Sequence, residues 1–282
     1  MIKIINTAKK MQKYADELRA EGKKIALIPT MGFLHAGHLS LIEEGCRHGN
    51  EIIVSIFVNP TQFAPGEDLE SYPKSFEKDC ELAEQSGATI IFAPDKNDLY
   101  GENYQTYISL DHLPKHLCGI SRPTHFRGVA TIVTKLFLIT KPHTAVFGQK
   151  DFQQLQVIKQ MVKDLNFDIK IIGAPIVREP DGLAMSSRNS YLTSEQRKQA
   201  LCLSQSLKKA LELVESGIYD ASQIIEQVLK IILVHSETKI DYIAICDPVT
   251  LSDVKIIKAP VLMALAVKIG NTRLIDNVII NP

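Results

Sequence analysis

A regular alternation of short apolar runs with longer helical segments, over the first two thirds of this chain, narrows its possible folds more than any other feature. Residues 24–29 (KIALIP), 52–58 (IIVSIFV) and 88–93 (ATIIFA) are apolar along nearly their whole length, unlike a strand that has one face in water. Parallel strands covered by helices on both faces have this character. We therefore predict βαβ units and an α/β fold.

Helical patterns fill the intervals between these runs. They are bounded by residues that favour the start or the end of a helix, such as Thr7 before the first helix and Gly22 after it. We predict helices over 7–18, 38–49, 75–87, 127–140 and 152–165, and two more strands over 144–147 and 169–172.

The pattern changes after about residue 175. Thr193 and Gln196 have the spacing of a capping box, which predicts the start of a helix. Helices come first and strands second in this region, which is typical of a small α+β domain. The polar segment 178–190 is the predicted boundary. We expect domains at residues 1–177 and 178–282, with helices over 193–215 and from 220 onward, and strands over 241–245 and 261–267.

Charge and hydropathy exclude several classes of protein. The 282 residues include 32 Lys and Arg and 32 Asp and Glu, and this zero net charge argues against a nucleic-acid-binding protein with a broad basic face. The uncharged apolar stretch 259–267 is about half as long as a membrane span, and the first residues (MIKIINTAKK) lack the apolar core of a signal peptide. We expect no nucleic-acid or membrane partner.

The five cysteines indicate a reducing compartment. They are odd in number, widely spaced and form no C-x-x-C pair. We therefore expect a cytoplasmic protein with buried or idle thiols, and neither disulfides nor a zinc site.

Residues 29–39 (PTMGFLHAGHL) carry the strongest local signal for a ligand. They follow a predicted strand and lead into a helix, where free backbone N–H groups can bind phosphate. Gly32 and Gly37 have the spacing of a P-loop, but His38 stands where that motif requires lysine, and no G-x-G-x-x-G occurs. His35 and His38 would lie together at the mouth of the turn. A metal site is the weaker alternative, because no third ligand has a matching spacing.

Two further segments lie at the ends of predicted strands. Gln62 in NPTQF (59–63) can donate and accept hydrogen bonds at the edge where parallel sheets bind ligands. Lys150 in GQKD (148–151) is a cation at another strand–helix junction, with Gln154 about one helical turn beyond. Taken singly, Gln62 is better explained as a turn residue and Lys150 as a solvated surface lysine.

Two segments resemble signatures of the nucleotidyltransferase superfamily, whose members place AMP on a substrate. H-x-G-H at 35–38 is similar to the first signature. MSSR at 185–188 resembles the second, Lys/Ser-rich signature, with Arg188 in the final place. Its hydroxyls and arginine could close over a triphosphate, although taken alone the segment is an ordinary interdomain loop.

The whole set resembles the pantothenate synthetase (pantoate–β-alanine ligase) family. Six motifs occur in that family's order, and the resemblance covers the chain, weakest over about the last ninety residues. Phe33, Ala64 and Gln149 stand where the family often has alanine, glycine and glutamate, and none of them removes a group with an assigned role. The motifs are PTMGFLHAGHLSL, IFVNPTQF, GEDLESYP, HFRGVATIV, FGQKDFQQL and REPDGLAMSSRN.

The resemblance implies a Rossmann-like N-terminal domain, a parallel sheet with helices on both faces, and a small α+β C-terminal lid domain. It implies that (R)-pantoate, β-alanine and ATP, with Mg²⁺, yield pantothenate, AMP and pyrophosphate through a pantoyl-adenylate. It also implies a cytoplasmic homodimer. The ligands of the metal are unknown, and Asp68 and Asp79 are only candidates for outer contacts.

The resemblance assigns roles to individual residues. Gln62 would contact both pantoate and β-alanine, and Gln154 would contact pantoate. His38 would take the proton-donor position, with His35, Lys150 and Arg188 as the other catalytic groups. The implied ATP contacts are Met31, Gly32, Phe33, Leu34, His35, Ala36, Gly37, His38, Gly148, Gln149, Lys150, Asp151, Val177, Met185, Ser186, Ser187 and Arg188.

Two other functions are compatible with the same residues. One is a related nucleotidylyltransferase that stops after nucleotide transfer, in which case β-alanine would have no effect. The other is a non-catalytic ATP-sensing protein, which would release no pyrophosphate. A role in charging tRNA is disfavoured by the neutral charge.

Overall fold

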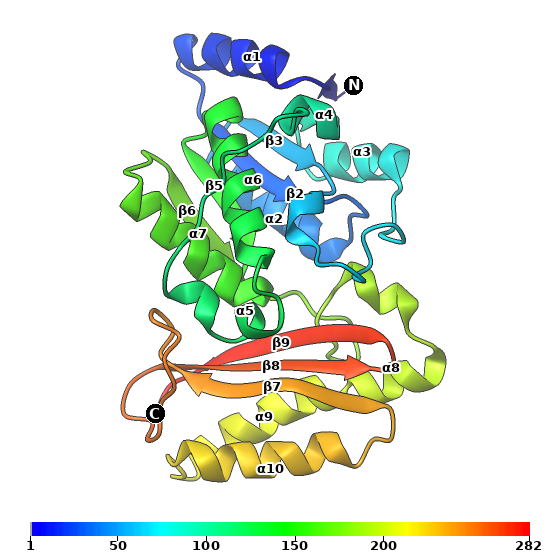
Figure 1. Ribbon diagram of the computed structural model, residues 1–282, viewed down its shortest axis with the longest axis vertical. Helices are drawn as coiled ribbons and strands as arrows, with labels where there is room; N and C mark the ends of the chain where they lie inside the picture. The colour runs from blue at the N-terminus through cyan, green and yellow to red at the C-terminus, as the bar shows by residue number, and fades with distance from the viewer. Residues whose placement is uncertain (1) are drawn as a thin grey trace. The chain divides into compact units, whose positions relative to one another are not determined.

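A computed structural model describes residues 2–282 and divides them into two compact units (Figure 1). Each unit has its own hydrophobic core. The first unit comprises the chain up to residue 110 and residues 122–149 and 154–175, and the second comprises 111–121, 150–153 and 176–282.

The first unit is built on a six-stranded sheet in which every neighbouring pair of strands is parallel. The spatial order is β1-β4-β3-β2-β5-β6. The chain leaves β2 toward β3 but leaves β5 toward β6 on the other side, so the carboxyl ends of β2 and β5 form the switch point at which such sheets bind ligands. The strands are β1 (Lys3–Ile5), β2 (Ile25–Thr30), β3 (Glu51–Ile56), β4 (Ile90–Phe92), β5 (Thr144–Gly148) and β6 (Lys170–Ala174).

Helices cover both faces of this sheet. Ile25 and Leu27 of β2 enter a core shared with α1, α6 and α7, whereas Ala26 and Ile28 face the opposite way and pack with α2 and α3. This arrangement confirms the α/β sheet expected from the apolar runs. The helices are α1 (Ala8–Ala20), α2 (Ala36–Cys46), α3 (Phe76–Gln85), α4 (Lys96–Leu99), α6 (His125–Thr140) and α7 (Phe152–Asp164).

Helix α1 shows how local sequence sets the bounds of an element. The hydroxyl of Thr7 accepts a hydrogen bond from the backbone N–H of the third residue of the helix. Met11, Ala15 and Leu18 recur at helical spacing and are the buried residues of α1. The helix ends just before Gly22, whose φ of +73° lies in the left-handed region that favours glycine.

The second unit contains an antiparallel sheet in the order β7-β8-β9. Figure 1 shows α9 and α10 along one face of this sheet, and their apolar side chains share a core with it. The expected small α+β region therefore forms. Its elements are α5 (Cys118–Ser121), α8 (Ser194–Ala200), α9 (Cys202–Glu215), α10 (Ala221–Leu233), β7 (Thr238–Cys246), β8 (Val261–Ile269) and β9 (Thr272–Ile280).

The structure differs from the expected elements in several places, among them the short helices α4 and α5, which were not predicted. β1 and β9 were not predicted, and the helix expected over 193–215 is two helices that are separated at Leu201. The pattern conceals β9 because Arg273, Asp276 and Asn277 interrupt its apolar residues. These polar side chains have partners far along the chain, so the strand needs no continuous apolar run.

Segment 111–121 joins the second unit through the amide of Gln153. The Nε2 of Gln153 donates to the carbonyl oxygens of Leu113 (2.9 Å) and His116 (2.7 Å), and its Oε1 accepts from the N–H of Cys118 (3.0 Å). A buried amide with three such bonds fixes a segment that has little regular structure of its own.

Two further observations bear on the class of protein. None of the helices in residues 2–282 combines the length and the apolar character needed to cross a membrane. All five cysteines are free thiols, and burial raises the pKa of Cys202 and Cys246 to about 12, so these two are unreactive at neutral pH.

Candidate functional site

The segment that follows β2 forms a tight left-handed turn. Gly32 has a φ of +83° and Phe33 a φ of +53°, and α2 begins three residues later. Thr30 stabilises the start of the turn, because its hydroxyl donates to the carbonyl oxygen of Ser55 (2.8 Å) and accepts from the N–H of Gly32 (3.2 Å). Two consecutive left-handed residues reverse the chain sharply enough to present the start of α2 at the end of the sheet.

An aspartate from another helix holds this turn. The N–H groups of Phe33 and Leu34 donate to the two carboxylate oxygens of Asp79 on α3, at 2.8 and 2.7 Å. Asp79 is only 2% exposed. Burial raises the pKa of this carboxyl even though the two N–H groups and the charge of Lys78 act to lower it.

His35 and His38 form a reciprocal cap at the start of α2. The Nδ1 of His35 accepts from the N–H of Gly37 (3.2 Å), and the Nδ1 of His38 accepts from the N–H of His35 (3.4 Å). This is the geometry of a capping box, made here by two imidazoles whose ring centroids are 4.1 Å apart. A neutral ring that accepts at Nδ1 carries its proton on Nε2. The turn therefore places two imidazoles, each with its proton on Nε2, beside a helix N-terminus.

Gln62 lies beside this turn. It ends the short 3₁₀ turn Pro60–Gln62 that follows β3, and its Nε2 is 3.1 Å from the sulfur of Met31. Its Oε1 accepts from the Nδ2 of Asn59 at 3.1 Å. The structure thus brings together Gln62 and the predicted ATP-binding turn, as the position of both after neighbouring strands implies.

Asn59 is a site residue to which the sequence analysis gave no role. It is 1% exposed, and its Oδ1 accepts from the hydroxyl of Tyr100 (2.8 Å), while its Nδ2 also donates to the carbonyl oxygen of Gly128 (3.2 Å). Burial raises the pKa of Tyr100 to about 12, so this phenol is a neutral donor. A Cβ on Gly128 would lie 2.3 Å from the carbonyl oxygen of Thr61, so only glycine allows α6 to approach the Gln62 turn this closely.

The backbone at Gln62 is held by the segment that leads into α6. The carbonyl oxygen of Gln62 accepts from the Nη2 of Arg122 at 3.1 Å and lies 2.8 Å from the Nδ1 of His125. Arg122 also forms a bidentate pair with Glu67, with both N···O distances at 2.6 Å. Burial raises the pKa of Glu67, but the bonds and charge of Arg122 outweigh it and the pKa is lowered. Among these residues, His125 lies in the HFRGVATIV motif and Glu67 in the GEDLESYP motif, whereas Arg122 lies in neither.

The remaining predicted residues of the first unit lie near the other side of the switch point. Gly148 ends β5, and the Nε2 of Gln149 donates to the carbonyl oxygen of Gly173 (3.1 Å). Gln154 is half-buried on α7. Nothing in the contacts of the described residues joins Gln154 to Gln62.

The predicted residues of the second unit are brought together by a hairpin. The N–H of Met185 donates to the carbonyl oxygen of Val177 (3.0 Å), and Arg178 pairs with Ala184 in an antiparallel bridge. The hydroxyl of Ser186 then accepts from the N–H of Arg188 (3.3 Å) and caps the 3₁₀ turn Ser187–Tyr191. Val177 and the MSSR segment therefore form one local structure.

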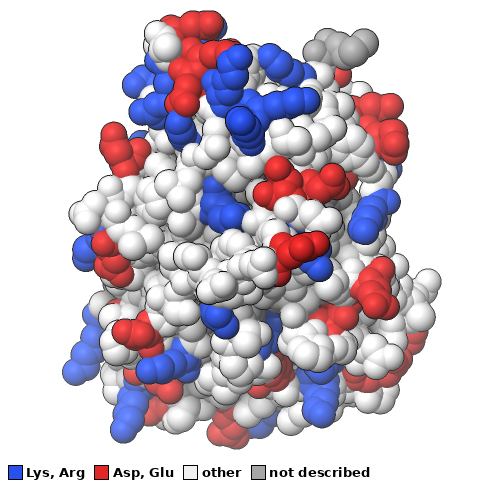
Figure 2. Space-filling model, turned by 45° about the horizontal axis from the view of Figure 1, so that its top comes forward, with Lys and Arg blue, Asp and Glu red and all other residues white. Residues whose placement is uncertain are grey.

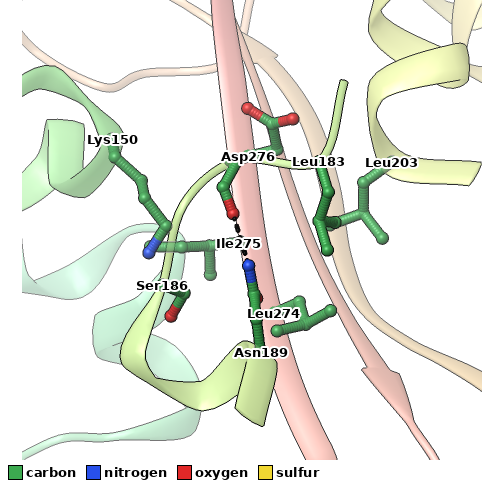
Figure 3. A pocket seen from close by; sticks show the side chains of 9 residues that line it. Lys150, Leu183, Ser186, Asn189, Leu203, Leu274, Ile275 and Asp276 are labelled. Atoms are coloured by element: carbon green, nitrogen blue, oxygen red, sulfur yellow. Dashed lines mark hydrogen bonds between the residues drawn. The ribbon is translucent and has the colours of Figure 1, made fainter. Parts of the chain in front are cut away.

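Lys150 and Ser186 line the same hollow of the second unit (Figure 3). The acidic residue in its wall, Asp276, is bound by both terminal nitrogens of Arg178 (2.7 and 2.9 Å), so its charge is already compensated. The buried Oδ1 of Asn189, another lining residue, has no hydrogen-bond partner. The amine of Lys150 can bind an anion, whereas the unpaired oxygen of Asn189 can only accept a hydrogen bond from a donor.

Strand β9 positions both parts of this hollow. Asp276 holds Arg178 at the base of the hairpin, and the Nδ2 of the next residue, Asn277, donates to the backbone carbonyl oxygen of Lys150 (2.8 Å). Asp151 is exposed and follows Lys150 in the 3₁₀ turn Gln149–Asp151. Most of the predicted ATP contacts thus form two local sets, the turn 31–38 in the first unit and Lys150, Val177 and 185–188 in the second. The others, Gly148, Gln149 and Asp151, lie at the end of β5 and in the 3₁₀ turn that follows it.

The charge on the visible surface is mixed. Figure 2 shows Lys and Arg interspersed with Asp and Glu over this face, without one broad basic surface. In the described residues, no group of three or more His, Cys, Asp or Glu is placed to hold a metal ion.

The chain is similar to a known protein family over nearly its whole length, both in sequence and in structure. The profile of the family described as pantoate-beta-alanine ligase matches residues 3–279. The pantothenate synthetase of Desulfatibacillum aliphaticivorans is 57% identical over 281 residues, which is 100% of each chain. The crystal structure of pantothenate synthetase from Thermus thermophilus has a TM-score of 0.94 at 37% identity and 100% coverage of both chains.

A third relative was solved with ligands. It is the pantoate-beta-alanine ligase from Francisella tularensis, complexed with beta-gamma ATP and beta-alanine. The TM-score is 0.82 at 34% identity, over 99% of this chain and 98% of that one.

Proposed function

The chain belongs to the pantoate–beta-alanine ligase family, and we propose that it joins pantoate to β-alanine in two steps driven by ATP. The observation that carries this proposal is the pair of imidazoles that cap α2 at the end of β2, next to Gln62. They place hydrogen-bond donors where a phosphate can approach a helix N-terminus, beside an amide that can bind a hydroxy acid.

In the first step, a carboxylate oxygen of (R)-pantoate attacks the α-phosphorus of ATP in line. The bond from that phosphorus to the bridging oxygen breaks, pyrophosphate leaves with the electron pair, and pantoyl-adenylate forms. Negative charge grows on the phosphate oxygens and on the leaving group. The imidazoles of His35 and His38 and the positive end of the α2 dipole stabilise this charge, with His38 as the proton donor.

In the second step, the amine of β-alanine attacks the acyl carbon of the adenylate. The bond from that carbon to the AMP oxygen breaks, AMP leaves, and the nitrogen loses a proton as the amide forms. Gln62 contacts both pantoate and β-alanine, and Gln154 contacts pantoate. Because the adenylate would be hydrolysed in open water, the residues around Gln62 must also exclude water during both steps.

The second unit supplies further phosphate contacts. Lys150, Ser186, Ser187 and Arg188 bind the triphosphate, and Val177 and Met185 contact the nucleotide. The hollow shared by Lys150 and Ser186 supports this part of the proposal, since the lysine there is a cation and the carboxylate in the wall is bound by arginine. In the first unit, Gly148 and Gln149 complete the ATP contacts, together with Asp151 of the second.

Magnesium accompanies ATP in this proposal. Mg²⁺ usually keeps several waters and is held by substrate phosphates and one or two carboxylates, so it needs no cluster of protein ligands. Of the two carboxylates considered as outer contacts, Asp79 uses both of its oxygens on the turn, which leaves it a poor ligand. The triphosphate itself would hold the ion and supply charge neutralisation for the leaving pyrophosphate.

One assay tests the function. Purified protein is incubated with ATP, Mg²⁺ and (R)-pantoate, with and without β-alanine, and the products are identified by mass. We expect pyrophosphate and enzyme-bound pantoyl-adenylate without β-alanine, and pantothenate and AMP once it is added. Release of pyrophosphate without any effect of β-alanine would favour a nucleotidylyltransferase, and ATP binding without pyrophosphate would favour a sensor.

The assembly and the mobility of the enzyme form the last part of the proposal. We propose a cytoplasmic homodimer, which light scattering of the purified protein tests as a mass of about twice 31.4 kDa. We also propose that the C-terminal domain, residues 178–282, acts as a lid. Small-angle scattering should then show a smaller radius of gyration with ATP and pantoate than without them.

A further inference from the structure

We propose that Asp79 is a positioning residue of the adenylate-forming site, because its carboxylate holds the left-handed turn from which His35 and His38 cap α2. This inference rests on the proposed function for its effect on catalysis. Its structural part, that Asp79 holds the turn, can be tested without any activity.

The geometry of the carboxylate is the first argument. Its two oxygens accept from two consecutive backbone N–H groups, those of Phe33 and Leu34, at 2.8 and 2.7 Å. Successive N–H groups that converge in this way form a concave anion-binding site, and here the anion is part of the protein. His35 follows Leu34 directly, so the same two bonds set the direction in which the chain enters α2.

The fit around the carboxylate is the second argument. A Cβ on Gly32 would lie 3.0 Å from the Oδ2 of Asp79 and 3.1 Å from the Cγ2 of Ile56. Glycine at this position therefore serves two purposes, since it adopts a φ of +83° and leaves room for the carboxylate. The turn and the aspartate are complementary in both shape and charge.

The energetic state of Asp79 is the third argument. Among the Asp, Glu, Lys, Arg and His side chains of residues 2–282, only Asp79 and Asp276 are buried, each 2% exposed. Asp276 is neutralised by Arg178, whereas the bonds made by Asp79 go to backbone N–H groups alone. A buried charge with no cationic partner is costly, and a neutral side chain would fill the same space. This free-energy cost is explained if the site needs the charged carboxylate of Asp79 to hold the turn.

The loss of the carboxylate should therefore disturb catalysis more than assembly of the fold. In Asp79→Asn the side chain keeps its shape but presents an NH₂ group to one of the two N–H donors, so one bond is lost and the turn relaxes. The imidazoles of His35 and His38 then lose the orientation that they have in the wild type. A misplacement of about 1 Å can cost on the order of 10²-fold in rate.

The test compares Asp79→Asn with the matched control Glu77→Gln, which removes an exposed charge from the same first turn of α3. We expect single-turnover formation of pantoyl-adenylate to slow on the order of 10²-fold in Asp79→Asn and to stay at the wild-type rate in the control. The KM for β-alanine should not change in either variant, because the change lies at the nucleotide turn. Wild-type adenylation in Asp79→Asn would overturn the inference.

Two further measurements test the inference independently of activity, and the second of them needs only the wild-type protein. Hydrogen exchange at the amides of Phe33 and Leu34 should be much faster in Asp79→Asn than in Glu77→Gln. In the wild type, the amide proton shifts of both residues should titrate together with one apparent pKa that lies above that of an ordinary aspartate. If neither amide senses Asp79, the inference fails. If both do while the wild type makes no adenylate, the proposed function fails instead.

Discussion

The two buried aspartates of this protein hold two predicted ATP-binding segments by different means. Asp79 in the first unit binds two backbone N–H groups of the turn after β2, whereas Asp276 in the second unit binds the guanidinium of Arg178 at the base of a hairpin. The first is an anion compensated by dipoles and the second is an ion pair. A turn can thus be fixed directly through its backbone or indirectly through a side chain next to it, with different consequences for stability and pH dependence.

Removing the cation from the second site should have the largest effect on stability. Arg178→Met leaves Asp276 buried with the N–H of Asn277 as a partner but without a cation, and breaking a buried ion pair costs about 3 kcal/mol or more. We expect about 3 kcal/mol, at the low end, because the Arg178 side chain is 33% exposed. Urea unfolding measures the loss.

Arg197→Met is the matched control for that variant. Arg197 pairs with Glu179 and Asp181, but all three side chains are between a fifth and a third exposed, so less than about 1 kcal/mol should be lost. Equal losses in Arg178→Met and Arg197→Met would show that burial of Asp276 is not what makes its partner important.

The next prediction concerns the rate of adenylate formation and compares the turn that contains His38 with the segment that contains Lys150. If both segments serve the first step, His38→Ala in one unit and Lys150→Met in the other should each slow adenylate formation on the order of 10²-fold. Single-turnover release of pyrophosphate measures this rate. His112→Ala, which removes an exposed histidine, should keep it. A normal rate in either of the first two variants would remove that segment from the mechanism.

Gly32→Ala tests the fit between the turn and Asp79. A left-handed alanine costs about 1–2 kcal/mol, and crowding against Asp79 and Ile56 adds to that cost. Gly66→Ala is a matched control, because Gly66 has the same φ of +83° with open space where the Cβ would lie. Thermal unfolding should therefore show a larger loss for Gly32→Ala than for Gly66→Ala, and similar losses would contradict the tight fit.

Asn277→Ala should have a smaller effect on the second region. It removes the bond to the carbonyl oxygen of Lys150, which is worth about 1 kcal/mol as a typical hydrogen bond. Because Lys150 then moves more freely, we expect the KM for ATP to rise while the KM for β-alanine stays constant. Steady-state kinetics with each substrate varied in turn decide this, and an unchanged KM for ATP would show that β9 does not position Lys150.

The pH dependence of the free energy of unfolding should distinguish Asp79 from a carboxylate that has a cationic partner. We expect this effect to be the smallest of those predicted here. Burial raises the pKa of Asp79, so the folded state binds its proton more tightly than the unfolded state does. The stability it contributes is fully present below the unfolded pKa and is lost as pH rises through the folded pKa. For Glu67, where Arg122 lowers the pKa, stability is present above the unfolded pKa and is lost as pH falls through the folded one.

The measurement is the free energy of unfolding of the wild type minus that of Asp79→Asn, and likewise for Glu67→Gln, as the pH is lowered from 7. As the pH falls, the stability of the wild type relative to Asp79→Asn should increase. Its stability relative to Glu67→Gln should decrease. Lys78 is the charged side chain that acts on Asp79, and His35 and His38 follow the turn that Asp79 holds. Their contributions are present in both the wild type and the variant, so the difference between the two cancels them. Curves of the same sign would refute the distinction.

Sequence analysis could locate the parts of this site that depend on neighbours in the chain. His35 and His38 are three residues apart, the spacing at which an N-cap residue and the third helical residue meet, and the structure places them there. The NPTQF segment follows a strand of the parallel sheet, so Gln62 was expected at its ligand-binding edge. The helix was expected at residue 38 and begins at 36, because a histidine cap lies outside the usual Ser, Thr, Asp or Asn signal.

The contacts that sequence analysis could not supply are those between distant residues. Asp79 lies 46 and 45 positions from the turn that it holds, and Arg178 and Asp276 are 98 positions apart. No periodicity reports such pairs, and Asp79 was considered only as an outer contact for magnesium. The same reason explains why segment 111–121 gave no sign that it joins the second unit, to which it is bound by Gln153.

The amino-acid sequence alone was enough to specify the parallel α/β arrangement, the places where strands end and candidate ligand-binding residues follow, and the closeness of His35 and His38 at the start of a helix. These features arise from hydrogen bonds and side-chain periodicities that span only a few residues. Which carboxylates are buried, and what they hold, became known only from the folded molecule. That depends on which distant segments the folded chain brings within about 3 Å, where a hydrogen bond can form.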